Sequence, residues 1–491
     1  MTDKRNAQLE QDARDLHQFG YAQQLLRDMG GFANFAVSFT IISILTGAIT
    51  LYGAGLSSGG PPVNGLGWLL VSLFTLLVAA SMAEIASKIP TAGAMYHWSA
   101  LLGGPAWGWF TAWFNLVGQV ATTAGIDFAI AQFAADLLGL SGQGPLLTIY
   151  ALLLVSHGLI NHYGVRAVAK VNDISVWYHI VVTLGLVATF WFFAPRQPLS
   201  FAFTTRFSTT THPYWWAFCL GLLQAQWTLT GYDASAHITE ETLDPRRNAS
   251  WGMFNAVWIS GVFGYLLVMA VTLAIQDLPA AAAAANPFIF IAEKALGPAF
   301  GKGLTWAVLP AMWFCGLSSV TTNARMIFAF SRDRGLLGHE YWAVVDPKHR
   351  SPVAAVWLAV VLAFAIGLYA KAFTVITSLS VIGLYVSYVI PIILVLRARA
   401  QGKWKDLGPW NLGPWGGLIN AASVVWVALI TVLFVAPPNQ LTGYTFAGLF
   451  VFLVVYYLAA VNGKFKGPKK LGTEEELMRM EKDLEKASHA A

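Results

Sequence analysis

Apolar stretches of about 20 residues recur along the whole chain, separated by short polar segments. A helix of that length crosses the roughly 30 Å of hydrocarbon in a bilayer. Twelve stretches follow this pattern, at residues 33–56, 66–87, 106–137, 146–163, 171–194, 214–236, 251–275, 304–331, 353–370, 374–396, 416–436 and 443–462. The pattern predicts an all-α membrane protein with 12 transmembrane helices, of which the third and eighth are long enough to tilt or to extend into water.

The composition also indicates that lipid is the solvent. Of the 491 residues, 56% are hydrophobic and 11% are charged, whereas soluble domains carry roughly 25% charged residues. At a mean hydropathy of +0.57, a soluble fold could not bury so many apolar side chains. Residues 1–30 are polar and mixed in charge, so we expect no cleavable signal peptide. Cys219 and Cys315 lie in apolar runs, a pattern that favours small buried side chains over a disulfide framework or a thiolate metal site.

The basic residues are distributed unevenly between the two sides of the predicted membrane. Of the 30 Lys and Arg residues, 24 fall on the side of the N-terminus and five on the other, with Arg325 inside the eighth stretch. By the positive-inside rule both termini lie in the cytoplasm. We expect a multi-pass protein of the plasma (inner) membrane, and the pI near 9.0 needs no nucleic-acid partner.

Two segments outside the spans carry local predictions. Residues 473–486 place acidic residues first and basic residues later, which is typical of a short capped helix in a solvated C-terminal tail. Residues 280–285 are alanine-rich and precede Asn286 and Pro287. We expect them to form a loop or a short surface helix.

Two of the predicted spans contain interruptions at matched places. The first includes residues 43–50 (SILTGAIT) and the sixth includes residues 227–235 (WTLTGYDAS). Interrupted helices in corresponding positions of two halves are typical of a transporter site at the bilayer midplane. An alternative interpretation is that Gly47 and Gly231 are points of close packing between helices.

Two carboxylates fall inside predicted spans, where an ionisable group is costly and functional by default. Asp233 follows Gly231 by two residues, which favours the binding-site interpretation. Asp127 lies nearer the outer third of the third span. We interpret Asp127 as a buried hydrogen-bonded acid or a gate residue rather than a direct substrate contact.

Several motifs together resemble those of the amino acid–polyamine–organocation superfamily. They are residues 231–233 (GYD) with 240–241 (EE) and 244–248 (DPRRN), residues 84–96 (EIASKIPTAGAMY), and residues 323–333 (NARMIFAFSRD). Ala94 departs from the second glycine of many members. Together with residues 121–128 (ATTAGIDF), these motifs are most similar to the amino acid/choline permeases, which move 4-aminobutyrate, other amino acids or choline. The resemblance covers residues 20–460.

The resemblance implies a leucine-transporter-like fold. Spans one to five and six to ten would form a 5+5 inverted repeat, with two extra helices outside it. The implied organisation is a cytoplasmic N-terminal tail at 1–30, a transport core at 31–400, spans eleven and twelve at 401–462, and a cytoplasmic C-terminal tail at 463–491.

The resemblance also implies a substrate site. Amides and hydroxyls around Ser43, Thr46 and Gly47 would hold a substrate carboxylate, as a positive half-helix end can do. Trp227 is at the position where relatives have an aromatic gate. The substrate amino group would bind backbone carbonyls that the helix breaks leave unpaired. The expected substrate-binding residues are Ser43, Thr46, Gly47, Gln119, Trp227, Thr228, Gly231 and Asp233.

The coupling ion has two alternatives. In cationic amino-acid relatives a lysine follows an asparagine of the fifth helix by seven residues, and the same count from Asn172 gives His179. Histidine titrates near neutral pH, so His179 could carry a coupling proton; a structural hydrogen bond to the backbone is the competing interpretation. A sodium site would instead use span-one carbonyls and the hydroxyls of Ser318, Ser319 and Thr322.

Other function classes find less support in the sequence. No HExxH or GxSxG motif appears, and no paired acids with histidine at helical spacing, so we expect no enzyme and no cofactor. A channel or receptor does not need two matched helix breaks. We predict a secondary active transporter, with a proton symporter favoured over an exchanger, a sodium symporter or a non-transporting nutrient sensor. The sequence leaves the oligomeric state open.

Overall fold

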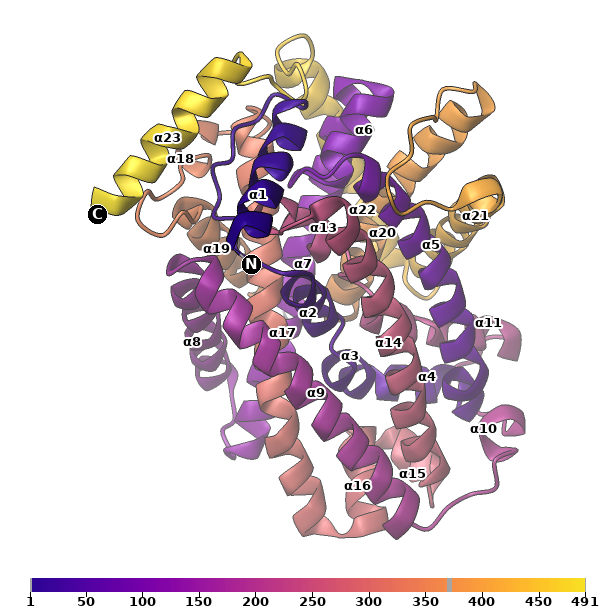
Figure 1. The fold of residues 1–491 in the computed structure, drawn as a ribbon. Helices are drawn as coiled ribbons and strands as arrows, with labels where there is room; N and C mark the ends of the chain where they lie inside the picture. Colours follow the sequence, from indigo (N-terminus) through magenta and orange to yellow (C-terminus); the bar gives the residue numbers. More distant parts are fainter. Residues whose placement is uncertain (1, 369–372, 491) are drawn as a thin grey trace.

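Long helices that run side by side make up most of the protein (Figure 1). The computed structural model describes residues 2–368 and 373–490. Within these ranges the only β pairing is two isolated bridges, Met29 with Thr242 and Asp346 with Ser351. The predicted all-α class is confirmed for the described residues.

Nine helical segments are long and apolar enough to cross a membrane among the described residues. One of them, formed by α2 and α3, is interrupted. The elements of these nine segments are α2 (Gly31–Ile42) with α3 (Ile44–Thr50), η1 (Val63–Gly67) with α5 (Trp68–Lys88), α8 (Gln143–His162), α9 (Val165–Phe193), α14 (Pro245–Leu273), α17 (Pro298–Arg332), α20 (Phe373–Ala400), η4 (Gly413–Trp415) with α21 (Gly416–Val435), and α22 (Gln440–Tyr456) with η5 (Tyr457–Val461).

The other three predicted spans coincide with helices that do not combine the length and the apolar composition of the nine segments. The third is α7 (Pro105–Leu137), and the ninth is α19 (Val353–Gly367), an apolar helix of 15 residues. The sixth is divided into the short helices α11 (Tyr214–Gly221), α12 (Leu223–Thr228) and α13 (Ala234–His237). The total of twelve spans therefore stays a prediction.

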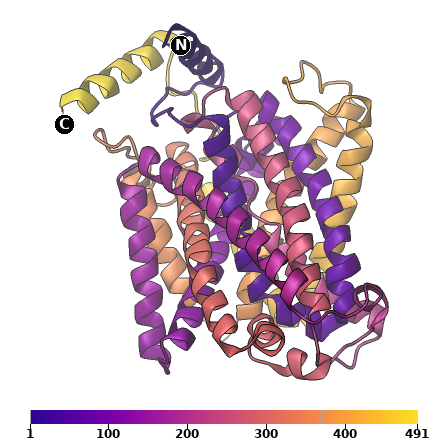
Figure 2. The same cartoon turned by 60° about the horizontal axis from the view of Figure 1, so that its bottom comes forward.

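Both ends of the described chain lie at the same end of the bundle, with α10, α15 and α16 at the opposite end (Figures 1 and 2). We call these the tail end and the loop end. The remaining elements, most of them short, are α1 (Thr2–His17), α4 (Tyr52–Gly59), α6 (Met95–Gly103), α10 (Phe201–Thr204), η2 (Thr239–Glu241), α15 (Leu278–Ala283), α16 (Pro287–Leu296), α18 (His339–Trp342) and α23 (Glu474–Ala490).

Both local predictions outside the spans are confirmed. At the start of α23, Thr473 N donates to Glu476 Oε2 at 2.7 Å and Glu476 N donates to Thr473 Oγ1 at 3.4 Å, which is a capping box. The alanine-rich segment forms α15, where the Asp277 side chain accepts from Ala280 N at 3.1 Å. These caps satisfy amides that the helix itself leaves unpaired.

The interrupted first span lies at the centre of the bundle. Of its apolar window 83% is buried, against 11% for the span formed by α22 and η5. Outer helices instead turn side chains such as Phe192 and Val425 outward, as expected where hydrocarbon surrounds the protein. The break in the first span is therefore enclosed by protein, which is where irregular backbone is tolerated at membrane depth.

Candidate functional site

The break in the first span lies at Ser43. Helix α2 ends at Ile42 and α3 begins at Ile44, and Ser43 between them has a φ of 27°, in the left-handed region that non-glycine residues rarely adopt. Its hydroxyl holds this conformation. Ser43 Oγ lies 2.6 Å from Thr46 Oγ1 and 2.8 Å from His179 Nε2, and it also accepts from Thr46 N at 3.3 Å.

The break in the sixth span lies between Thr228, the last residue of α12, and Ala234, the first of α13. Gly231 within it has a φ of 98°. A Cβ atom at this position would lie 2.3 Å from Ile41 Cγ2 on α2. Both the backbone angle and the close approach require glycine here, and Gly231 lies at the interruption as predicted.

Gly47 belongs to the predicted segment 43–50 but does not lie at the break itself. It lies inside α3, four residues past the break, and a Cβ atom on it would lie 2.5 Å from Thr228 Oγ1 and 2.7 Å from Thr228 Cα. Gly47 is therefore the point at which the half-helices α3 and α12 touch. The close-packing interpretation describes its geometry, and the interruption itself belongs to Ser43.

Replacing Gly47 with alanine is expected to force α3 and α12 apart, because backbone as well as side-chain atoms of Thr228 occupy the space. Overpacking of this kind costs about 1–3 kcal/mol. We expect a lower unfolding temperature and loss of substrate binding in a thermal-shift titration. Gly185→Ala is the matched control, since a Cβ atom there meets nothing within 4 Å; equal behaviour of the two variants would contradict the close contact.

A small cavity lies between the two breaks. Its walls come from the first, third, sixth and eighth predicted spans and combine apolar side chains with hydroxyls. The lining residues are Ile41, Ile42, Thr46, Gly47, Thr122, Ile126, Trp227, Thr228, Thr230 and Cys315. The space open to the centres of water molecules is about 10 Å³, which suffices for about one water. An amino acid fits only after these walls separate.

The polar groups at the cavity are satisfied within the protein in this closed state. The amides of Thr46 and Gly47 donate to Ser43 O at 2.8 and 3.0 Å. The carbonyl oxygen of Ile41, near the end of α2, accepts from Cys315 Sγ at 3.1 Å. Backbone groups of a broken helix are thus available at the cavity once these local contacts rearrange.

Four of the eight predicted substrate residues line this cavity, Ser43 and Gly231 lie at the two breaks beside it, and Gln119 and Asp233 are not in its wall. Thr46, Gly47, Trp227 and Thr228 are in its wall, and Trp227 Nε1 donates to Ser380 Oγ at 3.1 Å. The six lining residues not predicted from the sequence are Thr122, Ile126, Ile41, Ile42, Thr230 and Cys315. The first two are four residues apart on one face of α7, and this spacing was the available signal.

Gln119 and Asp233 form a hydrogen bond with each other and are not in the wall of the cavity. Gln119 Nε2 donates to Asp233 Oδ2 at 2.8 Å, Asn115 Nδ2 donates to the same oxygen at 3.2 Å, and Tyr388 OH donates to Asp233 Oδ1 at 2.6 Å. His237 Nε2 lies 3.3 Å from Asp233 Oδ2. Asn115 and Tyr388 were missed, although Asn115 and Gln119 share a helix face in the sequence.

His179 contacts the first break directly. Its Nδ1 lies 2.8 Å from the carbonyl oxygen of Ser175, which can only accept, so Nδ1 carries a proton. Nε2 of a neutral ring is then the acceptor for the Ser43 hydroxyl. The structural hydrogen bond from His179 to the Ser175 backbone is therefore present. His179 also contacts Ser43, the residue at the break.

The three hydroxyls of the sodium alternative turn toward different partners. Ser318 Oγ donates to Asn172 Oδ1, Ser319 Oγ lies 2.7 Å from Thr123 Oγ1, and Thr322 Oγ1 donates to Ser318 O at 3.1 Å. Each of the three hydroxyls therefore has its own hydrogen-bond partner within the protein. Within the described ranges no cluster of three or more His, Cys, Asp or Glu side chains could hold a metal ion.

The tail end is sealed by two buried ion pairs. Arg325 of α17 donates to both carboxylate oxygens of Glu241 at 2.8 and 2.9 Å, and Arg332 does the same to Glu240 at 2.8 and 2.9 Å. Bidentate pairs of this kind are the strong ones. They join two of the motifs that carry the family resemblance, residues 240–241 and 323–333.

The charge state of Glu240 favours the seal at neutral pH. Burial raises the pKa of its carboxyl, but the charge and hydrogen bonds of Arg332 outweigh burial and hold the pKa below its ordinary value. A folded-state pKa that is lowered adds stability above the ordinary pKa and loses it as the pH falls through the lowered value. The Glu240 contribution is therefore fully present near pH 7 and is lost in acid.

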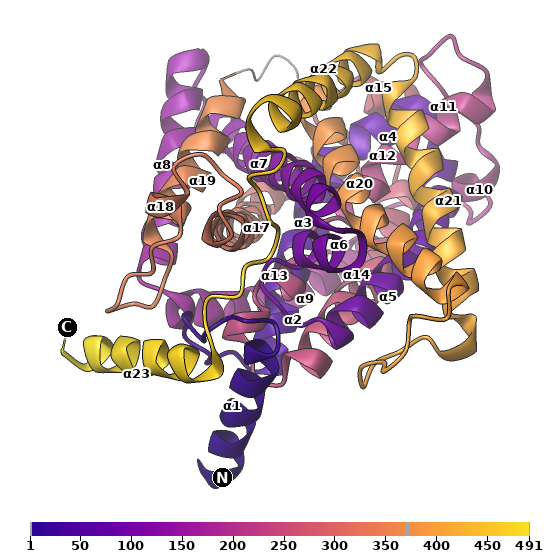
Figure 3. The ribbon, with the colours of Figure 1, turned by 90° about the horizontal axis from the view of Figure 1, so that it is seen from above.

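A third contact at the tail end centres on Asp333. Tyr21 OH and Tyr96 OH donate to its Oδ2 at 2.8 and 3.0 Å, His97 Nε2 lies 3.0 Å from that atom, and Lys469 N donates to Oδ1 at 3.1 Å. Lys469 belongs to the connection between η5 and α23, which crosses the tail-end face (Figure 3). One carboxylate thus holds three other segments of the chain, those of Tyr21, of α6 and of Lys469.

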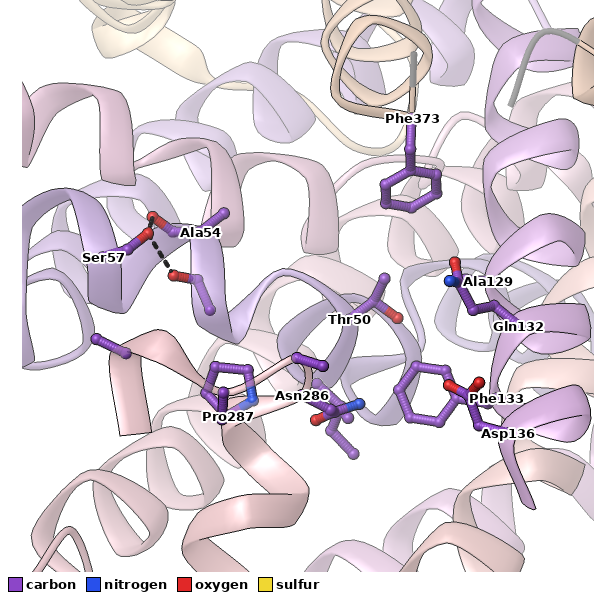
Figure 4. A pocket seen from close by; sticks show the side chains of 15 residues that line it. Thr50, Ala54, Ser57, Ala129, Gln132, Phe133, Asp136, Asn286, Pro287 and Phe373 are labelled. Carbon is purple, nitrogen blue, oxygen red and sulfur yellow. Dashed lines mark hydrogen bonds between the residues drawn. The ribbon is translucent and has the colours of Figure 1, made fainter. Parts of the chain in front are cut away.

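At the loop end the protein is open. A pocket of about 400 Å³, here called the vestibule, lies between α3, α4, α7 and the start of α16 (Figure 4). Its polar lining residues are Thr50, Ser57, Gln132, Asp136 and Asn286. Ile49 and Ala129 of the vestibule lie one turn from Thr46 and Ile126 of the closed cavity. The structure is therefore sealed at the tail end and hollowed at the loop end.

The chain is similar in sequence to known proteins over most of its length. Residues 30–459 match the amino acid permease family. The chain belongs to this family. The permease is 37% identical to "Amino-acid permease BAT1 homolog" of Oryza sativa subsp. japonica, over 92% of this chain and 94% of that protein. It is 36% identical to "Amino-acid permease BAT1" of Arabidopsis thaliana, over 92% and 95%.

A more distant relative is the "GABA-specific permease" of Saccharomyces cerevisiae, 25% identical over 93% of this chain and 86% of that protein. These likenesses confirm the predicted superfamily. The permease is a membrane-spanning amino-acid transporter and not an enzyme.

Proposed function

We propose that the permease is a secondary active transporter that moves an amino acid or a related small amine, such as 4-aminobutyrate or choline, by proton symport with alternating access. The observation that carries this proposal is the closed cavity between two helix breaks, with His179 hydrogen-bonded to the residue at one break. Interrupted helices at matched places are the usual frame of a transporter site.

The proposed setting is the plasma (inner) membrane, with the tail end in the cytoplasm. The excess of basic residues on the side of the termini supports this orientation. In this arrangement residues 31–400 form the transport core of two inverted repeats, residues 401–462 add two helices, and the segments 1–30 and 463–491 are cytoplasmic tails. The vestibule then faces the outside, and the ion pairs of the tail end close the inner path.

The proposed substrate site is the cavity and its immediate surroundings. The carboxylate would bind where α3 begins, at Ser43, Thr46 and the amides that now donate to Ser43 O. The amino group would take the carbonyl of Ile41 that Cys315 now occupies, while Gly47, Thr228 and Gly231 set the spacing of the walls. Widening along α7 would bring Gln119 and Asp233 into contact with the amino group.

The proposed coupling group is His179. In the neutral ring, Nε2 accepts a hydrogen bond from the Ser43 hydroxyl. A second proton on the imidazole turns Nε2 into a donor, so the Ser43 hydroxyl must direct its own hydrogen elsewhere. Since that hydroxyl also contacts Thr46 at the start of α3, protonation alters the part of α3 that the substrate carboxylate would occupy.

Uptake into proteoliposomes tests the proposal. Radiolabelled amino acids, 4-aminobutyrate and choline should be offered with an imposed pH gradient, with a sodium gradient, and with unlabelled substrate inside. We expect accumulation of at least one compound with the pH gradient. Accumulation with sodium alone favours a sodium symporter, uptake only against internal substrate favours an exchanger, and no flux despite binding favours a sensor.

Trp227→Ala is expected to lower the rate of uptake at least tenfold, because it removes an aromatic wall of the cavity and a face available to a cation. Trp216→Ala is the control, since Trp216 is not in the wall of the cavity and its indole N–H donates to the Pro437 carbonyl. An uptake rate unchanged by Trp227→Ala would show that Trp227 only packs.

A further inference from the structure

A second buried histidine lies beside the cavity and has no role in the function proposed above. His157 of α8 faces Asp127 of α7, with Nδ1 at 3.3 Å from Oδ2. Both side chains are fully buried. A carboxylate and an imidazole inside a membrane-spanning bundle are costly to retain, and such groups are rare outside ion and proton pathways.

Each member of the pair also keeps one unused polar atom. Asp127 Oδ1 and His157 Nε2 are buried and have no hydrogen-bond partner among the described residues. More than nine in ten buried polar groups in proteins are paired. The orphaned atoms face α17, where a Cβ atom on Gly316 would lie 2.2 Å from Asp127 Oδ1 and 2.5 Å from His157 Cε1.

The Asp127–His157 pair lies close to both the closed cavity and the vestibule. Ile126, which precedes Asp127 on α7, and Cys315, which precedes Gly316 on α17, are in the wall of the closed cavity. Further along α7, Ala129 and Phe133 are in the wall of the vestibule. Asp127 therefore lies between the vestibule and the cavity along one helix.

The charge of the pair depends on how many protons it holds. With none the net charge is −1, with one the pair is neutral, and with two it is +1; the protons belong to the pair rather than to either residue. The other titratable groups that act on the pair are Tyr150 of α8 and Cys315 of α17, both neutral near pH 7 by type. Among the residues that the structure describes, no Lys or Arg side chain forms an ion pair with Asp127.

Five buried titratable groups on the other helices packed against α7 and α8 have partners elsewhere. Helix α19 carries no titratable residue. The side chains concerned are Tyr388, which contacts Asp233, Tyr96 and His97, which contact Asp333, Arg325, which contacts Glu241, and His179, which contacts Ser43.

We propose that Asp127 and His157 form a proton-binding site beside the substrate cavity, reached from the vestibule and separate from His179. Only its place in the transport cycle rests on the function proposed above; proton binding by the pair does not. The ligand is the proton, and the orphaned atoms are where a second proton or a water that carries it would bind. Gly316, which has no side chain, lets both side chains of the pair approach α17 closely.

Trp313 provides a direct reporter of this proton. Its ring centroid lies 5.2 Å from that of His157, and a protonated imidazole quenches the fluorescence of an adjacent indole. The fluorescence of Trp313, taken as the difference between the full chain and Trp313→Phe in lipid nanodiscs, should fall as the pH is lowered from about 8 to 5. His157→Gln should abolish this response.

Matched variants separate the proton site from a structural hydrogen bond. Asp127→Asn should move the quenching to lower pH, because the imidazolium loses its counter-charge. His162→Gln, at the end of the same helix, and His179→Gln should leave it unchanged. A flat response in the unmodified chain, or a response that survives His157→Gln, overturns the proposal.

The proposed proton symport can fail without affecting this result. If accumulation does not depend on the pH gradient but Trp313 still responds to pH through His157, the proton site stands and the coupling proposal falls. If accumulation follows the pH gradient while Trp313 shows no response, the coupling stands and the Asp127–His157 site falls.

Discussion

His179→Ala is expected to reduce accumulation driven by an inward proton gradient to the level of empty liposomes. The imidazole is the group that links the break at Ser43 with α9, through Nε2 to Ser43 Oγ and Nδ1 to Ser175 O. Alanine removes both contacts and the titrating ring. Exchange of internal for external substrate should persist, because the remaining walls of the cavity are intact.

The measurement is uptake with and without the pH gradient, at equal amounts of reconstituted protein. His162→Ala is the control, since His162 lies at the end of α8 and contacts Trp357 rather than the cavity. Retained gradient-driven accumulation in His179→Ala would refute the coupling role. Uptake by the unmodified chain that ignores pH and rises with external sodium would transfer that role to Ser318, Ser319 and Thr322.

Arg325→Ala is expected to destabilise the protein by about 3–5 kcal/mol, the usual cost of leaving one partner of a buried ion pair uncompensated. Glu241, with no exposed side-chain surface, would then be charged without its counter-ion in the centre of the tail-end seal. We expect a lower unfolding temperature and a leak of substrate through liposomes that the unmodified chain keeps tight.

Arg166→Ala provides the comparison. Arg166 also pairs with a carboxylate, Asp28, but its side chain is 71% exposed, and surface pairs contribute about 0–1 kcal/mol. The double variant Arg325→Ala with Glu241→Gln should recover part of the loss, because it removes the orphaned charge as well. Equal unfolding temperatures for Arg325→Ala and Arg166→Ala would contradict the assigned role.

The sequence predicted the helices of this protein better than the contacts between them. Apolar length located the helices, since hydrocarbon demands about 20 apolar residues whatever the neighbours are. The interruption of the sixth span was also visible, because only glycine adopts the backbone angle of residue 231 at that contact. The first interruption falls inside the predicted segment 43–50, at Ser43, where hydrogen bonds hold the break. The sequence did not separate that residue from Gly47, which packs closely against Thr228.

Partnerships between distant segments were beyond the sequence. Glu240 and Arg332 are 92 residues apart, and both stood in motifs that were recognised separately. Asp127 was interpreted as a buried hydrogen-bonded acid, and the structure bears this out with His157 as its partner. Spacing along α8 could not reveal that partner, because the contact is set by how α7, α8 and α17 pack.

The contact at Asp333 also implies an order of events during synthesis. Tyr21, Tyr96 and His97 are made before Asp333 and fold with it, whereas the backbone amide of Lys469 reaches this carboxylate only after α19 to α22 have been inserted in the membrane. Chains fold from the N-terminus as the ribosome makes them. The contact between Lys469 and Asp333 is therefore made after both ion pairs of the tail end can form, and each newly made permease completes it only when the helices before Lys469 are in place.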